Sequence, residues 1–587
     1  MRRTKIVCTL GPATNDVEIM KQLIRNGLDA ARINFSHGTY ETHSDTIAKL
    51  KQAREELGAP IPLILDTKGP EIRVKNFTEE KVYLEQGASF TLTTRDVDGD
   101  KNIAAVTYDQ LPRDLQKGSR VLIDDGLIEL RVESTTDTDV LCTVINGGVV
   151  KSHKGVNLPG IDVNLPSLTE KDVEDLKFGV ANGFDIVAAS FIRSAADVVK
   201  IRQVLEENGG GHIHIISKIE NQQGVDNIDE ILEVSDGIMV ARGDLGVEIP
   251  PEEVPLVQKK LIYKSNRIGK PVITATQMLE SMVNSPRPTR AEANDVANAI
   301  FDGSDAIMLS GETAAGSYPL EAVATMARIA MRAESSIDYA TKIVSDTEPA
   351  RINITNAISM AACAAAAELD TAAITTITRS GFTARMIAKH RPICPLIAST
   401  PDEGVWRRMN LIWGCMPMLY TGELPKGGVF EASLKIAMRS GLLKNGDTVV
   451  SALGMPLGVS GSTNTMRVDI VGDVLCKGKG VGTKRVSGKA RVIAARDGVE
   501  HTFHPGDILV TTFTDNSFMP YIRKAGAIVV GPLDQNSNSH AEVAGSALDI
   551  PVIVCNAKVV DFIPNQALIT VDAQKGFVYK GIPEDAE

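Results

Sequence analysis

The stretch that decides the fold is His214-Ile215-Ile216-Ser217-Lys218-Ile219-Glu220-Asn221, a short apolar run that ends in charged and amide side chains. A second run of the same form follows at residues 237–244, and it ends in Arg242, Gly243 and Asp244. Short apolar runs rich in β-branched residues predict buried strands. Because a helical pattern follows each run, the two strands are expected to lie parallel in one sheet.

The same pattern occurs eight times in the first part of the chain. The eight runs lie at residues 6–11, 30–36, 62–67, 185–191, 214–221, 237–244, 271–277 and 306–312. A strand followed by a helix, repeated eight times, predicts a closed (β/α)8 TIM barrel. We assign this barrel, the expected catalytic domain, to residues 1–69 and 167–344.

The long segment between the third and fourth runs, residues 70–166, has a different pattern. Short alternating strands are separated by Gly and Asp turns such as Asp124-Asp125-Gly126. This texture predicts a small inserted β-barrel domain. Because the insert leaves after the third strand and returns before the fourth, we expect it to cover one end of the TIM barrel as a lid.

Two further domains are expected after the TIM barrel. Residues 345–474 show an α/β pattern, with strands at 373–377, 395–398 and 448–452 and a helix at 383–390. The glycine-rich residues 477–482 are interpreted as a linker. The remaining residues, 475–587, are expected to form an extra small C-terminal domain.

Composition narrows the class of protein. The formal net charge of −12 argues against nucleic acid as the main partner. No segment reaches the roughly 18 apolar residues of a membrane span, and the N-terminus lacks a signal-peptide pattern, so a cytoplasmic location without membrane contact is expected. Seven cysteines without a C-x-x-C pair argue against a disulfide framework or a structural zinc site.

The reacting centre is predicted at the carboxyl ends of the barrel strands, where the loops converge. Lys218 and Glu220 are two residues apart, so their side chains leave the same face of the strand. A structural ion pair is the simpler interpretation of such a pair. The second carboxylate, Asp244 on the next strand, favours a Mg²⁺ site beside a positive charge that suits a phosphoryl group.

Further polar residues collect at the same strand ends. Arg32 and Arg73 carry forked donors able to grip phosphate oxygens. Gly243 allows a ligand to approach the backbone, and the helix start after it can receive a carboxylate. Each of four other residues is individually more typical of a strand-end cap, but together they supply oxygens for a monovalent cation: Asn34, Ser36, Asp66 and Thr67.

These residues lie in motifs that resemble the pyruvate kinase family. The motifs occupy residues 31–38, 65–73, 217–221, 239–246, 273–282 and 308–314, in the family's order. The resemblance implies transfer of the phosphoryl group of phosphoenolpyruvate to ADP, which gives pyruvate and ATP. It also implies a requirement for Mg²⁺ (or Mn²⁺) and K⁺.

The resemblance assigns roles to individual residues. Glu220 and Asp244 correspond to the Mg²⁺ ligands, and Lys218 to the cation that stabilises the moving phosphoryl group. The family's K⁺ ligands correspond to Asn34, Ser36, Asp66 and Thr67. Its substrate contacts correspond to Arg32, Lys218, Gly243, Asp244 and Thr276. Its nucleotide contacts correspond to Asn34, His37, Arg73 and Lys154. Glu71 corresponds to the acidic residue of K⁺-requiring members.

Protonation of the enolate requires a separate donor, because a charged lysine is a poor base. We expect Thr276 to act with a water relayed through Ser310 and Glu312, on the face opposite the phosphoryl group. Positioning and charge neutralisation account for the transfer itself, and Arg73 is counted with the catalytic residues for this reason.

A regulatory site is expected in the α/β domain. Thr378, Arg379, Ser380, Gly381 and Thr383 lie between a strand and a helix, where hydroxyl and N–H groups form an anion site. An ordinary helix-capping loop is the alternative interpretation. The resemblance favours an activating phosphorylated effector, either AMP or a sugar phosphate, and a homotetramer.

Residues 539–554 resemble the swivelling phosphohistidine domain of phosphoenolpyruvate-utilising enzymes, with His540 at the phosphate-carrying position. The upstream Gly531-Pro532 and Asn538 depart from that pattern, and we find no partner ATP-binding domain, so a structural or interface role is expected. Two alternatives to a pyruvate kinase are a phosphotransferase acting through His540 and a catalytically dead metabolite sensor. The second would lack Lys218, Glu220, Asp244 or Thr276, which are all present.

Overall fold

The computed structural model describes residues 2–339, 353–422, 428–456, 461, 463–472, 474–493, 503–531 and 539–582. The chain divides into two compact units. The first unit contains Met1–Cys363, Ile377–Thr421 and Gly454–Asn464, and the second contains Ala364–Thr376, Gly422–Leu453 and Thr465–Glu587.

The first unit contains the predicted eight-stranded parallel barrel. Its strands are β1 (Lys5–Thr9), β2 (Ala30–Asn34), β3 (Leu63–Asp66), β12 (Ile186–Ala189), β13 (His214–Ile219), β14 (Gly237–Ala241), β15 (Val272–Ala275) and β16 (Ala306–Leu309). They close in the order β1-β16-β15-β14-β13-β12-β3-β2. The register places Lys218 beside Met239 and Asn34 beside Asp66. All eight predicted strands are therefore confirmed.

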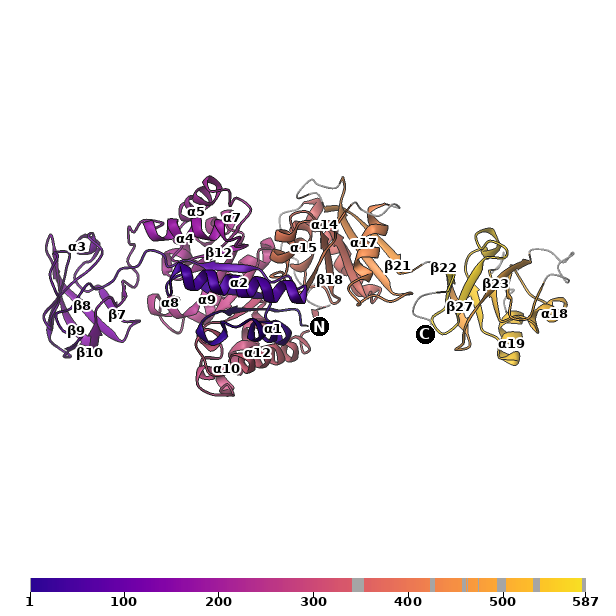
Figure 1. Ribbon diagram of the computed structural model, residues 1–587, viewed down its shortest axis with the longest axis horizontal. Helices are drawn as coiled ribbons and strands as arrows, with labels where there is room; N and C mark the ends of the chain where they lie inside the picture. Colours follow the sequence, from indigo (N-terminus) through magenta and orange to yellow (C-terminus); the bar gives the residue numbers. More distant parts are fainter. Residues whose placement is uncertain are drawn as a thin grey trace. The chain divides into compact units, whose positions relative to one another are not determined.

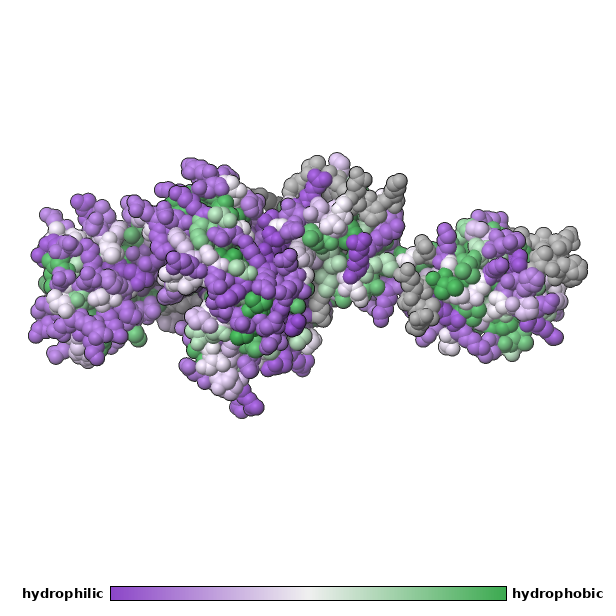
Figure 2. Space-filling view, viewed as in Figure 1, coloured by the Kyte–Doolittle hydropathy of each residue, from purple (hydrophilic) through white to green (hydrophobic). Residues whose placement is uncertain are grey.

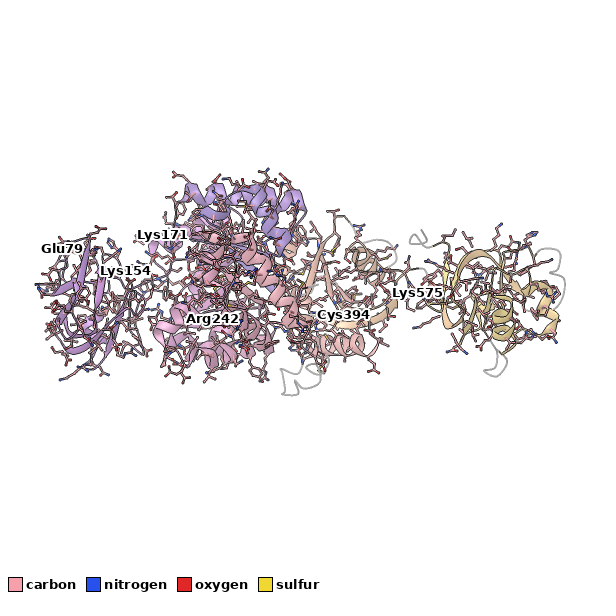
Figure 3. All side chains as sticks on the ribbon, turned by 90° about the horizontal axis from the view of Figure 1, so that it is seen from below. Glu79, Lys154, Lys171, Arg242, Cys394 and Lys575 are labelled. Atoms are coloured by element: carbon pink, nitrogen blue, oxygen red, sulfur yellow. The ribbon has the colours of Figure 1, made fainter. Side chains whose placement is uncertain are left out.

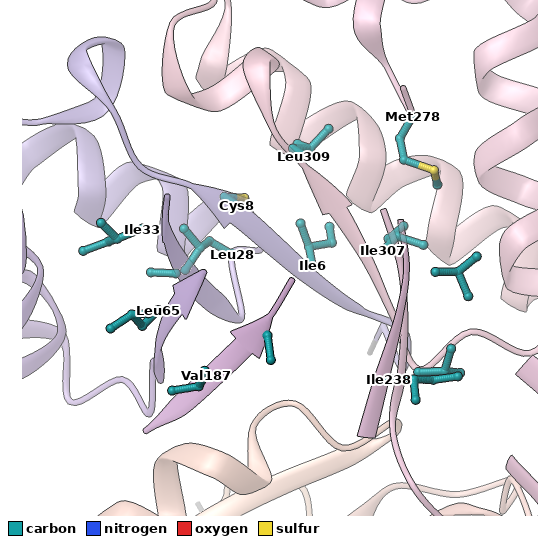
Figure 4. Close-up of a cluster of buried hydrophobic side chains, with 14 of the residues drawn as sticks. Ile6, Cys8, Leu28, Ile33, Leu65, Val187, Ile238, Met278, Ile307 and Leu309 are labelled. Atoms are coloured by element: carbon teal, nitrogen blue, oxygen red, sulfur yellow. The ribbon is translucent and has the colours of Figure 1, made fainter. Parts of the chain in front are cut away.

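Alternation along each strand separates two layers of apolar side chains. Residues of one parity, such as Val7, Ile64 and Ile216, fill the inside of the barrel. Residues of the other parity, such as Ile6 and Ile215, belong to the cluster that packs against the helices, part of which Figure 4 shows around Ile6, Cys8 and Leu309. Because successive side chains point to opposite faces of a strand, this parity also determines which polar residues face inward.

Helices surround the strand ring (Figure 1). They are α1 (Val17–Asn26), α2 (Tyr40–Leu57), α4 (Glu170–Ala181), α5 (Ala195–Glu207), α6 (Gln222–Asp226), α7 (Ile228–Val234), α8 (Arg242–Glu248), α9 (Val254–Ile268), α10 (Arg290–Asp302), α11 (Gly311–Ala314) and α12 (Pro319–Glu334). Local signals set their ends. At α10, Thr289 and Glu292 form a capping box at the start, and Gly303, at φ +102°, ends the helix.

The insert is an all-β domain with its own apolar core. Its elements are β4 (Lys81–Leu84), β5 (Ser89–Thr93), β6 (Ile103–Ala105), α3 (Leu111–Asp114), β7 (Arg120–Ile123), β8 (Ile128–Thr135), β9 (Asp139–Asn146), β10 (Gly148–Lys151) and β11 (Val156–Asn157). The strands pair in a six-stranded sheet, β11-β7-β8-β9-β5-β6, and a two-stranded sheet, β10-β4. A separate core explains how this segment folds as an insertion without disturbing the parallel barrel.

The remainder of the first unit is a small α/β portion. The parallel strands β18 (Leu396–Thr400) and β19 (Cys415–Leu419) alternate with α15 (Phe382–Ala388) and α16 (Glu403–Met409). Arg391 joins this portion to the barrel, since its guanidinium donates to Asp305 at 2.8 Å and to the Gly303 carbonyl at 2.6 Å. The helix α14 spans Ile354–Glu368, and its residues up to Cys363 belong to the first unit.

The second unit contains a second closed barrel. The elements that lie wholly or mostly in this unit are β17 (Ala373–Ile377), α17 (Val429–Met438), β20 (Thr448–Gly454), β21 (Thr463–Ile470), β22 (Val474–Val481), β23 (Arg485–Ile493), β24 (Ile508–Thr511), α18 (Met519–Ile522), β25 (Ala527–Val530), α19 (Ser539–Leu548), β26 (Val552–Cys555), β27 (Leu568–Asp572) and β28 (Phe577–Lys580). The ring order of the barrel is β22-β26-β25-β24-β23-β27-β28. β17 pairs in parallel with β20.

The interpretation of residues 477–482 as a linker was wrong, because most of them belong to β22. Gly478 and Gly480 lie where other backbone segments approach closely. A Cβ atom at Gly478 would lie 2.2 Å from the Val554 carbonyl oxygen, and one at Gly480 would lie 1.7 Å from that of Ala573. These glycines therefore permit close packing in the ring, which composition alone does not distinguish from flexibility.

Within the described residues, no helix combines the length and apolar character needed to cross a membrane. The face shown in Figure 2 is largely hydrophilic, with small apolar patches between the polar side chains. Isolated apolar residues of this kind are normal on protein surfaces.

A side chain at Gly237, the first residue of β14, is expected to destabilise the barrel. A Cβ atom there would lie 2.6 Å from both the Pro271 carbonyl oxygen and the Ile216 side chain. Gly237→Ala should lower the free energy of unfolding by about 1–3 kcal/mol because the strands must move apart. Chemical denaturation measures this, with Gly148→Ala as control, since its Cβ would lie 3.6 Å from Ile128. Equal stability of the two variants would contradict the argument.

Candidate active site

Polar side chains occupy the inward-facing positions at the carboxyl ends of the barrel strands. Lys218 and Glu220 have the parity of Ile216, and Asp66 has that of Ile64, both of which are interior apolar residues. The same parity applies to Thr9, Arg32, Ser190 and Ser310. The barrel is therefore apolar in its middle and polar at one end, so the charged groups meet above an apolar floor.

Asp66 is the negative centre of this polar end. Its side chain is 1% exposed, and its two oxygens bind two cations: Oδ2 lies 2.6 Å from Arg32 Nε, and Oδ1 lies 3.2 Å from Lys218 Nζ. Burial alone would raise the pKa of Asp66, but Arg32 and Lys218 outweigh it and hold that pKa below its ordinary value. Asp66 is thus charged, and it orients both cations.

Lys218 has three acceptors within the protein. Its ammonium donates to Ser190 Oγ at 2.8 Å and pairs with Glu220 Oε1 at 2.9 Å, in addition to Asp66. Burial by itself would lower the pKa of Lys218, but Asp66 and Glu220 hold it above its ordinary value. Lys218 is therefore held as a positive charge at the end of β13.

Glu220 and Asp244 carry more negative charge than Lys218 alone neutralises. Burial, with a contribution from Asp244, raises the pKa of Glu220 to about 7, although Lys218 opposes the shift. Burial likewise raises the pKa of Asp244. The other oxygen of Glu220 accepts a hydrogen bond from the Phe191 N–H at 2.6 Å. Two carboxylates destabilised in this way favour an additional cation.

The two carboxylates of Glu220 and Asp244 suit Mg²⁺, which needs only some of its ligands from the protein, better than a metal ion that is bound entirely by protein side chains. Among the residues that the structure describes, no group of three or more His, Cys, Asp or Glu side chains could hold a metal ion. Mg²⁺ is commonly bound through one or two carboxylates together with waters and substrate phosphates. Glu220 and Asp244 meet that requirement, and the remaining positions would fall to substrate and water.

The four oxygen residues predicted for K⁺ lie at the ends of the paired strands β2 and β3 and just beyond. Asn34 is paired with Asp66 in the register, and Asn34 Oδ1 accepts from the Ser36 N–H at 3.0 Å. Thr67 Oγ1 accepts from the Ser190 N–H at 3.0 Å. All four supply hard oxygen atoms, which suits an alkali cation.

The loop after β15 holds Thr276 in a strained conformation. Thr276 and Gln277 have φ values of +69° and +53°, which non-glycine residues rarely adopt. Thr276 Oγ1 accepts from the Gly243 N–H at 2.8 Å and donates to the Ala275 carbonyl. This hydrogen bond joins the ends of β14 and β15 and brings Thr276, Gly243 and the start of α8 together.

Glu312 holds the neighbouring loops through both of its carboxylate oxygens. One oxygen accepts from the Leu279 N–H at 3.0 Å and the other from the Ser310 N–H at 2.7 Å. Burial raises the pKa of Glu312. The structure thus places Ser310 and Glu312 in contact, and it shows Glu312 supporting the loop that carries Thr276.

Three of the four predicted nucleotide residues line a cavity of about 590 Å³ between barrel and insert, and Asn34 is not among its lining residues. His37, Arg73, Lys154 and Asp244 are among its lining residues. Arg73 Nε donates to Glu71 at 2.6 Å, and Lys154, labelled in Figure 3 on the insert, pairs with Asp124 at 2.7 Å. The cavity volume lies in the range typical of small-molecule sites.

The predicted effector loop is a compact turn in the first unit. The Gly381 N–H donates to Thr378 Oγ1 at 3.0 Å and the Phe382 N–H to Ser380 Oγ at 3.4 Å. Thr383 Oγ1 lies 2.8 Å from Thr463 Oγ1, while Arg379 is exposed. The N–H groups of Gly381 and Phe382 are therefore bonded to hydroxyl groups of the same loop. This arrangement agrees with the alternative interpretation of an ordinary helix-capping loop.

In the second unit, both ring nitrogens of His540 face polar side chains. Nδ1 lies 3.1 Å from Thr514 Oγ1 and Nε2 lies 3.2 Å from Asn516 Oδ1. Pro532 and Asn538, which carry the departure from the phosphohistidine pattern, lie outside the described residues.

Two residues with important contacts were missed by the sequence reasoning. Ser190 accepts a hydrogen bond from Lys218. Arg242, which is labelled in Figure 3, donates to Asp295 at 2.7 Å and to the Thr276 carbonyl at 2.7 Å. Both stand at strand ends, so position was an available signal. Nothing in their residue types distinguished them from ordinary polar caps.

Comparison with known proteins covers nearly the whole chain. The family profile "Pyruvate kinase, barrel domain" matches residues 1–323, "Pyruvate kinase, alpha/beta domain" matches 356–469, and "PEP-utilising enzyme, mobile domain" matches 503–576. Pyruvate kinases from Geobacillus stearothermophilus and Sporosarcina psychrophila are 49% and 47% identical to the chain, each over 99% of both sequences. That of Bacillus licheniformis is 46% identical, also over 99% of each.

Proposed function

The chain belongs to the pyruvate kinase family, and we propose that Lys218, Glu220 and Asp244 form the reacting centre of its activity. It is a phosphotransferase of glycolysis that transfers the phosphoryl group of phosphoenolpyruvate to ADP. The observation that carries our assignment is the buried Lys218 ammonium, 2.9 Å from Glu220 and 3.2 Å from Asp66. The phosphotransferase through His540 and the inactive sensor are not favoured by these comparisons.

Lys218 stabilises the phosphoryl group during transfer. Its raised pKa keeps it protonated, and its three protein acceptors hold the charge at the end of β13. A preorganised charge requires no reorganisation as negative charge spreads over the equatorial oxygens. Arg32, oriented by Asp66, would grip the phosphoryl oxygens from the adjacent side.

Glu220 and Asp244 would hold Mg²⁺ or Mn²⁺ at the same place. The bound ion supplies Lewis-acid stabilisation of phosphoryl and carboxylate oxygens. Gly243 lets the substrate approach the backbone, and the N–H groups of the first turn of α8 beyond it would receive the substrate carboxylate. Thr276 bonds to the Gly243 N–H, so a bound carboxylate would meet Thr276 as well.

Asn34, Ser36, Asp66 and Thr67 would hold K⁺ next to this centre. The support is their shared position on β2 and β3 and their exclusively oxygen donors. Glu71 pairs with Arg73, so in this chain Glu71 orients an arginine that would bind the nucleotide. Because Glu71 is acidic, it supplies no positive charge of its own, and K⁺ would supply the monovalent positive charge.

ADP would occupy the cavity between barrel and insert. Arg73 and Lys154 from the insert and His37 and Asn34 from the barrel would contact its phosphates. Because these residues come from both domains, closure of the insert would assemble the nucleotide site and exclude water from it.

Protonation of the enolate at its methylene carbon would complete the reaction. Thr276 stands at the centre, and Glu312 binds the loop that carries it and the Ser310 N–H. A water held by Thr276, Ser310 and Glu312 would deliver the proton on the face opposite the phosphoryl group. Lys218 stays charged throughout.

The assignment also extends to domains and regulation. We assign the catalytic barrel to residues 1–69 and 167–344, the lid to 70–166, the effector-binding domain to 345–474 and the phosphohistidine-like domain to 475–587. Full-length similarity to pyruvate kinases supports a cytoplasmic homotetramer. The exposed Arg379 supports binding of AMP or a sugar phosphate at residues 378–383.

Replacement of Lys218 tests the assignment of the reacting centre. Lys218→Met should lower kcat by about 10²–10³-fold, since one preorganised charge on the transition state is lost. Pyruvate formation from phosphoenolpyruvate and ADP is measured with and without Mg²⁺ and K⁺, and the unmodified enzyme should need both. Lys264→Met is the control, because Lys264 is bound to Asp229 on the outside of the barrel. A near-normal kcat for Lys218→Met would contradict the proposal.

Ser190 should act by positioning Lys218. Ser190→Ala removes the 2.8 Å bond, and a loss of about 1 kcal/mol corresponds to a roughly fivefold lower kcat with a smaller change in the KM for ADP. Ser190→Thr should restore activity because it keeps the hydroxyl. The matched control is Ser217→Ala, whose hydroxyl bonds to Ser235 on the opposite face. Equal losses in both alanine variants would indicate a general packing effect.

Thr276→Ala tests the protonation step. Proton exchange into the methyl group of pyruvate should fall more than phosphoryl transfer does, because the water loses one of its ligands. Isotope incorporation from heavy water, followed by NMR, separates the two rates. The role of Thr276 is disproved if exchange proceeds at the normal rate in this variant.

A further inference from the structure

Two cysteines of the second barrel lie in contact. The sulfur atoms of Cys476 and Cys555 are 2.7 Å apart. Cys476 is on β22 and Cys555 is the last residue of β26, and both belong to one buried apolar cluster. The catalytic centre does not use either residue, and both lie in the same compact unit.

The strand pairing explains why the two sulfur atoms meet. β22 and β26 are antiparallel, with Gly478 directly opposite Cys555. Cys476 is two residues from Gly478 and so lies on the same face, diagonally across from Cys555. Because Gly478 lacks a side chain, the strands approach closely there and the space beside Cys555 stays open toward Cys476. The close contact is thus a consequence of backbone register.

Other functions of a thiol pair do not fit this position. Over the described ranges, no third His, Cys, Asp or Glu completes a metal site. A disulfide bond is about 2.05 Å long and requires Cα atoms roughly 4.4–6.8 Å apart. Residues placed diagonally across two antiparallel strands have Cα atoms about 7–8 Å apart, so bond formation draws β22 and β26 slightly together at this point. Only a small approach of the two sulfur atoms separates the present pair from a covalent bond.

We propose that Cys476 and Cys555 are a modification site, at which oxidation forms a disulfide within the C-terminal barrel. The oxidant is a low-molecular-weight disulfide. The Cys476 thiolate attacks it, which forms a mixed disulfide and releases one small thiol. The Cys555 thiolate then attacks the Cys476 sulfur, which forms the protein disulfide and releases the second small thiol. The protein loses two protons and two electrons, and the oxidant is reduced to two thiols.

Burial sets the order and the rate of these steps. Cys476 is 9% exposed and Cys555 is 1% exposed, so Cys476 is the residue that meets the oxidant. The hydrogen bond to Cys555, together with burial, raises the pKa of Cys476. The reaction is therefore slow, and the same burial shields the completed disulfide from reduction.

The disulfide bond would link β22 to β26, which are neighbouring strands in the ring of the second barrel. These strands are far apart in the sequence, so the crosslink restricts the unfolded chain over a long loop. The oxidised barrel should unfold at a higher temperature, and its β22 and β26 backbone amides should exchange hydrogen more slowly. The catalytic residues are elsewhere, so kcat should not change.

The test uses the full chain incubated with oxidised glutathione and then denatured in the presence of an alkylating agent. The number of free thiols should fall from seven to five, and peptide mapping without reductant should find Cys476 linked to Cys555. Dithiothreitol should restore all seven thiols and the lower unfolding temperature.

Matched variants make the result decisive. Cys476→Ser should retain six free thiols with no crosslink, and Cys555→Ser should stop at a glutathione mixed disulfide on Cys476 with five. Cys142→Ser, which removes a buried cysteine of the insert, should still form the crosslink. A second incubation in mildly denaturing urea, which exposes the two cysteines transiently, tests whether burial prevents oxidised glutathione from reaching them. In the unmodified chain, seven free thiols under both conditions, a glutathione adduct on Cys476 without the crosslink, or linkage to another cysteine would each overturn the proposal.

Discussion

The buried carboxylate of Asp66 is the interaction on which the catalytic end of the barrel depends. It is 1% exposed and binds Arg32 with one oxygen and Lys218 with the other. A buried charge without partners is costly, so the site is stable only while all three groups remain together. This triad fixes two cations, Arg32 at the end of β2 and Lys218 at the end of β13, on either side of Asp66. Glu220 and Asp244 then complete an arrangement in which one more cation and an anionic substrate are electrostatically favoured.

Backbone hydrogen bonds extend this order into the loops. The Phe191 N–H binds Glu220, the Gly243 N–H binds Thr276, and Glu312 binds the Leu279 and Ser310 N–H groups. The bonds to Glu220, to Thr276 and from the Leu279 N–H each join the end of one barrel strand to the next, and the bond from the Ser310 N–H fixes the loop after β16. The loops that carry the chemistry are therefore held by the same polar groups that would contact substrate, which explains how Thr276 maintains a positive φ at the centre of the site.

Much of this site could be predicted because parity and position are simple properties of a strand. Lys218 and Glu220 are two residues apart and follow an apolar run, so their shared inward face was evident. Ser190 and Arg242 were overlooked because their roles arise from contacts with residues on other strands. The error at residues 477–482 has a related cause. Glycine serves flexible linkers and close strand contacts equally well, and only the neighbouring carbonyls of Val554 and Ala573 distinguish the two.

The sequence by itself determined the class of fold, the family and the residue types of the reacting centre, since periodicity, strand-end chemistry and motifs are local. Tertiary structure alone decided which groups pair. It divided Asp66 between Arg32 and Lys218, placed Ser190 against Lys218, and brought Cys476 and Cys555 into contact across two strands. These outcomes depend on strand register and on the distances between side chains far apart in the chain, which no local pattern encodes.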